Sequence, residues 1–76
     1  MIKLDEIRSK LQFAIKHCGY NQSELARRLG IHYSAVSQYL SGRSMPALDT
    51  FANICVLLDL DANEILCVSD NIRIDK

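Results

Sequence analysis

A small residue, a glycine and a β-branched residue stand at fixed offsets in the first half of the chain, and this spacing strongly constrains the fold. Ala26 is followed four residues later by Gly30 and six residues after that by Val36. A small residue such as Ala26 suits two helices that cross closely. Gly30 suits a turn with positive φ, which glycine adopts at little cost. Val36 then predicts that a second helix folds back onto the first, so we expect two short helices joined by a tight corner.

Apolar residues recur at helical spacing along most of the chain, and no segment strongly predicts a strand. The expected helices cover residues 5–18, 22–29, 33–41, 47–58 and 62–67. Asp5, Asn21 and Asp61 are suited to cap the first, second and fifth of these helices at their N-termini. Gly19 is suited to end the first helix in a left-handed conformation. The sequence therefore predicts an all-α, five-helix domain.

The fourth helix and the chain end carry further expectations. Its apolar stripe is read as Leu48, Phe51, Ala52, Cys55 and Leu58. Pro46 belongs to its first turn, where the missing N–H does no harm. Residues 1–68 are expected to form the domain and residues 69–76 a tail. The alternation Ile72-Arg73-Ile74 leaves a short edge strand, a frayed end or a contact with a second chain open, and we favour the last two.

Composition narrows the class of protein. A chain of 76 residues that is 49% hydrophobic and 24% charged fits one globular domain. It has no apolar run near the ~20 residues that span a bilayer and no visible signal peptide, so we expect a cytoplasmic protein. The three cysteines lack the spacing of a disulfide framework or a zinc site. We therefore expect no metal and no cofactor, and we interpret Cys55 as a core residue.

The balanced total charge hides an asymmetry along the chain. Residues 1–46 carry seven Lys and Arg against three Asp and Glu, a net charge of +4, and residues 47–76 carry two against six, a net charge of −4. A polyanion would be attracted to the first part and repelled by the second. The alternative, a set of solvated helix faces with no charged partner, stays open on charge alone.

The residues around the corner resemble a known family. The run Gln22-Ser23-Glu24-Leu25-Ala26-Arg27-Arg28-Leu29-Gly30-Ile31 resembles the Q-x-x-L-A-x-x-L-G-[IV] signature of the lambda-repressor-like (XRE/Cro-C1 type) helix-turn-helix family. The likeness continues without gaps over roughly residues 5–67. It implies a compact five-helix fold that binds double-stranded DNA, usually as a homodimer and usually to repress transcription.

The resemblance also implies which residues read base edges. The third helix would enter the major groove, which admits one α-helix. Its outward positions that match the family's base-contacting positions are Tyr33, Ser34, Ser37 and Gln38. Gln38 can donate and accept at once, as the adenine N6 and N7 edge requires. An ordinary solvated polar face is the alternative for these four residues.

Phosphate contacts are expected at the start of the second helix and on both sides of the third. The candidate residues are Asn21, Gln22, His32, Ser41, Arg43 and Ser44. Asn21 and Gln22 begin a helix, where backbone N–H groups and the helix dipole favour an anion. Arg27 and Arg28 either line the DNA side or pair with Glu24 and solvent.

The chain departs from the family pattern in four places. An Arg–Glu pair common in the family is replaced by Ile15 and Leu40, so we expect an apolar contact in place of a buried ion pair. His32 stands where a Ser or Thr cap is common, and if protonated it could meet a phosphate. Asp59 replaces the usual glycine between the fourth and fifth helices. The loop over residues 41–46 holds one Arg, which predicts modest nonspecific affinity for DNA.

These observations predict a sequence-specific DNA-binding transcriptional regulator acting as a dimeric repressor. The alternative is a protein-interaction module, such as an antitoxin or an adaptor without its own operator. An enzyme is not expected, because no Ser-His-Asp set or Gly-rich phosphate loop is present. The apolar residues left for pairing two copies are Ile65, Leu66, Val68, Ile72 and Ile74.

Overall fold

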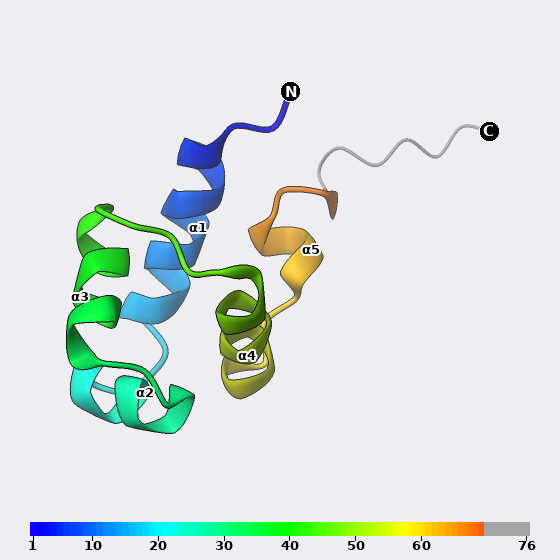
Figure 1. Cartoon of the computed structure of the whole chain (residues 1–76). Coiled ribbons are helices and arrows are strands. Elements are labelled where there is room, and N and C mark those ends of the chain that lie inside the picture. The colour runs from blue at the N-terminus through cyan, green and yellow to red at the C-terminus, as the bar shows by residue number, and fades with distance from the viewer. Residues whose placement is uncertain (70–76) are drawn as a thin grey trace.

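The computed structural model describes residues 1–69 and is all-helical over them (Figure 1). Its five helices are α1 Leu4–Lys16, α2 Gln22–Leu29, α3 Tyr33–Ser41, α4 Leu48–Leu58 and α5 Ala62–Ile65. The expectation of an all-α, five-helix fold is confirmed. Of the predicted tail over residues 69–76, residues 70–76 with the Ile72-Arg73-Ile74 alternation lie outside the described residues.

One core joins all five helices. α2 packs against α3 and α4, while α1 packs against α3 and α5. Figure 1 shows α3 and α5 on opposite sides of α1. The most deeply buried side chains are Leu11, Leu25, Val36 and Ile54. These four side chains come from α1, α2, α3 and α4, one from each helix. The first four helices therefore pack around a single apolar core.

The first helix differs from its prediction at both ends. Its N-cap residue is Lys3, whose side chain makes no capping hydrogen bond, so the assignment of Asp5 as the N-cap is wrong. Asp5 lies instead in the first turn, where a carboxylate interacts favourably with the helix dipole. The helix ends at Lys16, two residues early, and Gly19 adopts the expected positive φ of 89° in the following turn.

The buried stripe of α4 was assigned partly to the wrong residues. Leu48 is 84% exposed and Ala52 is also exposed, whereas Ile54 is fully buried beside Phe51 and Cys55. The helix begins only at Leu48, so this residue projects past the edge of the core in the first turn. Ala47 is the N-cap residue, so Pro46 precedes the helix instead of standing in its first turn.

The last corner places a non-glycine residue in a left-handed conformation. Asp59 follows α4 with φ 56° and ψ 49°, and Leu60 N donates to Cys55 O at 2.8 Å. Asp61 then caps α5 as predicted, since its carboxylate accepts from Asn63 N at 3.0 Å. α5 is shorter than predicted, because the chain turns at Leu66 and Cys67.

Candidate nucleic-acid interface

The corner between α2 and α3 has the geometry that its spacing demands. Ala26 is 3% exposed and Val36 is completely buried, so the two helices meet through these side chains. Gly30 has φ 70° and ψ 30°, and the next amide, Ile31 N, donates to Ala26 O at 3.0 Å. An added Cβ at Gly30 would meet no atom within 4 Å. Glycine is therefore required here by backbone conformation and not by lack of space.

The N-terminus of α3 is capped by a histidine. His32 Nδ1 accepts from Ser34 N at 3.1 Å and lies 2.9 Å from Ser34 Oγ. A backbone N–H can only donate, so this cap uses a neutral imidazole whose remaining proton is on Nε2. Nε2–H is then the group that a phosphate would meet.

The outward face of α3 is polar and its inward face is apolar. All four of the predicted base-reading side chains are exposed: Tyr33, Ser34, Ser37 and Gln38. On the other side of the helix, Val36 is buried and Tyr39 is 8% exposed. Burial raises the pKa of the Tyr39 hydroxyl, and the Asp49 carboxylate raises it further. The helix is thus held by one face while the other is free to meet a groove.

The turn after α3 is hydrogen-bonded to both the backbone carbonyl and the side-chain amide of Gln38. The Gln38 carbonyl accepts from Arg43 N at 3.0 Å and from Ser41 Oγ at 3.1 Å. Its side-chain Oε1 accepts from Ser44 Oγ at 3.3 Å. A carbonyl oxygen has a second lone pair, so the oriented amide can still accept one hydrogen bond and donate two. Ser41, Arg43 and Ser44 therefore lie together beside the exposed end of α3.

At the start of α2, Asn21 serves as the cap. Its Oδ1 accepts from Glu24 N at 2.8 Å. The Glu24 carboxylate accepts from Arg27 Nη2 and Arg28 Nε, each at 2.7 Å, instead of turning back to the cap. These two arginines, Arg27 first, hold the pKa of the Glu24 carboxyl below its ordinary value. Both arginines pair with Glu24 and keep exposed side chains, so their place relative to DNA stays a prediction.

The apolar replacement of the family's ion pair is accompanied by a polar link that sequence reasoning missed. Ile15 is 3% exposed and Leu40 packs against the core. One turn earlier on α1, Gln12 Nε2 donates to Leu40 O at 3.0 Å and to Tyr39 O at 3.4 Å. Gln12 thereby satisfies carbonyls that the end of α3 would otherwise leave open. The one sequence feature that could have indicated this link is the Gln12 side chain itself, which lies three residues before Ile15 and therefore near the same face of α1.

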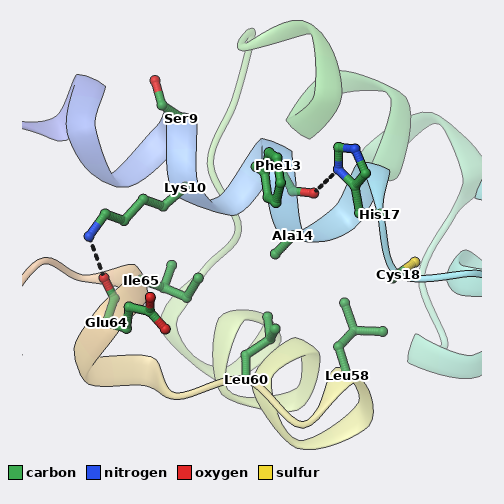
Figure 2. Close-up of a pocket in the computed structure, with 10 residues that line it drawn as sticks. All are labelled: Ser9, Lys10, Phe13, Ala14, His17, Cys18, Leu58, Leu60, Glu64 and Ile65. Atoms are coloured by element: carbon green, nitrogen blue, oxygen red, sulfur yellow. Dashed lines mark hydrogen bonds between the residues drawn. The ribbon is translucent and has the colours of Figure 1, made fainter.

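A groove lies on the other side of α1 from α3. It has a volume of about 660 Å³ and is bounded by α1 and by the corner that joins α4 to α5 (Figure 2). Phe13 is 65% exposed on its wall, and its ring stacks on that of His17 with centroids 4.1 Å apart. Lys10 Nζ donates to Glu64 O at 3.2 Å across one end. Over residues 1–69, no group of three or more His, Cys, Asp or Glu side chains is arranged to hold a metal ion.

In a comparison with known protein families, residues 11–65 match a family model described as helix-turn-helix. The match begins at Leu11 in the middle of α1 and ends at Ile65, the last residue of α5. The search of curated proteins and the search of solved structures returned no match. Within the described part of the chain, every helix is too short or too polar to cross a bilayer.

Proposed function

Because the chain belongs to the Cro/C1-type helix-turn-helix family of DNA-binding regulators, we propose that it is a sequence-specific transcriptional repressor that acts as a homodimer in the cytoplasm. DNA binding follows from the family, which is one of regulators and not of enzymes. Base reading by named residues, dimerisation and repression are the parts that we propose.

The exposed polar face of α3 is the observation that supports base reading. Four side chains capable of hydrogen bonding stand on one side of a helix whose other side is buried. The helix is capped by His32 at one end and held by Gln12 at the other. Because its orientation is fixed before DNA arrives, little ordering cost falls on binding. Gln38 is the residue best suited to specify a base, since Ser44 already orients its amide.

Backbone phosphates are proposed to contact the groups at either end of the helix-turn-helix. At the start of α2 these are Asn21 and the half-buried Gln22, beside the backbone amides of the first turn. At the ends of α3 they are His32, Ser41, Arg43 and Ser44. Such contacts position the protein without reading sequence.

A dimer would place two copies of α3 about 34 Å apart in successive major grooves and occlude polymerase over a palindromic site. The structure narrows the surface expected for pairing. Ile65 is 6% exposed and belongs to the core, so it is one of the apolar residues that packing within a single copy takes up. Val68 is 37% exposed and Leu66 is half-buried, and these two stay candidates. Ile72 and Ile74 lie outside the described residues.

Selection of bound sequences from a random DNA pool at fixed salt tests the proposal directly. We expect one enriched palindromic site. Gln38→Ala is then expected to relax the preference at one position per half-site by about 1–3 kcal/mol. Arg43→Ala is expected to weaken binding to all sequences alike. Equal affinity of wild type and Gln38→Ala for every variant of the site would refute the assignment of Gln38.

The second candidate function is a protein-interaction module, such as an antitoxin or an adaptor. The groove beside α1, with the exposed ring of Phe13, is the observation in its favour. A stable complex with a partner protein, together with the absence of salt-sensitive DNA binding, would select this function over repression.

A further inference from the structure

The turn that follows α3 is poor in positive charge for a surface that meets DNA. Residues 41–46 contain one cation, Arg43. Arg27 and Arg28 belong to α2 and not to this loop, and both donate to the Glu24 carboxylate. The C-terminal end of α3 also carries the negative end of the helix dipole. A phosphate near this turn therefore needs more positive charge than the loop itself supplies.

The structure brings a second arginine to this turn from α1. Arg8 lies across Gly42, because a Cβ added at Gly42 would come within 3.3 Å of Arg8 Cδ and 3.8 Å of its Nε. Gly42 directly precedes Arg43 in the chain. The stem of Arg8 therefore packs beside the residue that directly precedes Arg43, although 35 positions separate the two arginines in sequence.

The guanidinium of Arg8 is only partly engaged. Its Nη1 donates to Asp5 Oδ1 at 2.6 Å, while its Nε is buried and makes no hydrogen bond with the described residues. The Arg8 side chain is 28% exposed and the Asp5 side chain is 89% exposed. Arg8 is thus held in place by packing, and its charge partner is an exposed carboxylate that water or another anion can replace. Ion pairs exposed to this extent contribute little to stability.

We propose that Arg8 binds a DNA backbone phosphate together with Arg43, and that this phosphate takes the place that Asp5 occupies on Arg8 in the free protein. A guanidinium offers paired N–H donors that match the oxygens of a phosphodiester. Packing against Gly42 fixes the stem of Arg8 beforehand, so less side-chain freedom is lost on binding. The proposal rests on the DNA-binding function above and adds a contact from α1 to it.

The test is the salt dependence of binding to a duplex of random sequence, followed by fluorescence anisotropy in buffers of rising salt concentration. Each phosphate contact contributes about 0.9 to the slope of log affinity against log salt concentration. Arg8→Gln is expected to lower the slope by about 1. Lys10→Gln is the matched control, because it removes the same charge from the side of α1 that faces α5. It is expected to leave the slope nearly unchanged.

Asp5→Asn tests the same contact without touching the packing over Gly42. We expect it to tighten binding about twofold to fivefold, the range that loss of a weak competing ion pair allows. Glu6→Gln removes the same charge from the same turn of α1, and it is expected to have a clearly smaller effect. Equal tightening by both variants would show a general charge effect and overturn the proposal.

Thermal unfolding of each variant separates a structural role from a binding role. Arg8→Gln with a lowered melting temperature and an unchanged salt slope would mean that Arg8 serves only packing, and the proposal would fail while DNA binding stood. Arg8→Lys keeps the charge and most of the stem, so it is expected to retain the slope. Wild-type protein with no salt-dependent DNA binding would instead remove the function on which the proposal rests.

Discussion

Helices α3 and α4 have similar lengths and both end at a residue with positive φ, yet their exposed faces differ. Gly42 is the C-cap of α3, which presents hydroxyl and amide groups to solvent. Asp59 is the C-cap of α4, which presents two large apolar side chains, Leu48 at 84% and Val56 at 82% exposure. α3 has a side-chain cap, whereas the N-cap residue of α4, Ala47, provides none. The comparison separates a helix with a polar outer face, which we propose enters a DNA groove, from one whose outer face carries large apolar side chains.

The largest expected effect distinguishes the two faces of α4. Ile54→Ala should destabilise the protein by about 2–5 kcal/mol, because it opens a cavity at a fully buried position. Val56→Ala should change stability by no more than about 0.5 kcal/mol at its exposed position. Urea unfolding of both variants measures the difference. A cost above 1 kcal/mol for Val56→Ala would mean that a second surface covers this face in solution, and repeating the measurement at tenfold lower protein concentration would identify a second copy.

Capping provides the next contrast, since it differs between the two helices. His32→Ala removes the acceptor for Ser34 N and should cost about 1 kcal/mol. Ala47→Ser supplies an acceptor that α4 lacks and should gain a comparable amount. Thermal or chemical unfolding gives both values. If His32→Ala left the free energy of unfolding unchanged, the side-chain cap of α3 would not stabilise the protein, and the difference in capping between α3 and α4 would have no effect on stability.

At the other end of α3, Gln12 should stabilise the last turn. Gln12→Ala is expected to cost about 1 kcal/mol through loss of the hydrogen bonds to Tyr39 O and Leu40 O. Gln12→Glu should cost more, since a carboxylate cannot donate and faces the negative end of the helix dipole. Chemical unfolding of the two variants at neutral pH tests this order. Equal losses would indicate that Gln12 acts through its methylene groups alone.

The smallest expected effect depends on pH and involves both helices. The pKa of Tyr39 is raised by burial and by Asp49 of α4, so the folded state favours the neutral phenol. Its contribution to stability is present below the ordinary tyrosine pKa of about 10 and is lost as pH rises through the raised value. Tyr39→Phe should therefore lose less stability than wild type above about pH 10. Cys55, whose pKa is also raised by burial, titrates in both proteins, so its effect cancels in the comparison.

Local signals in the sequence predicted α2 and α3 better than the rest. Both helices have the predicted bounds, because Asn21, Gly30 and Gly42 mark their ends through backbone chemistry that depends on few neighbours. The stripe of α4 was harder, since two overlapping sets of apolar residues both have helical spacing. Only packing against the other helices selects Ile54 over Leu48.

Contacts between distant segments were beyond the reach of sequence reasoning. The hydrogen bonds of Gln12 and the position of Arg8 over Gly42 join residues 27 to 34 positions apart. They depend on the angle between α1 and α3, which periodicity does not specify. The roles of the polar residues on α3 in DNA binding stay predictions, because they follow from family resemblance and exposure.

Two consecutive residues of α1 contribute to different surfaces of the protein. Gln12 is bonded to the end of α3, and Phe13 lines the groove beside α5. α1 therefore contributes both to the contact with α3 and to the groove beside α5. A displacement of α1 would change both of them. A substitution in the groove that alters DNA affinity is accordingly no proof of contact with DNA, and the melting temperature and the orientation of α1 have to be compared first.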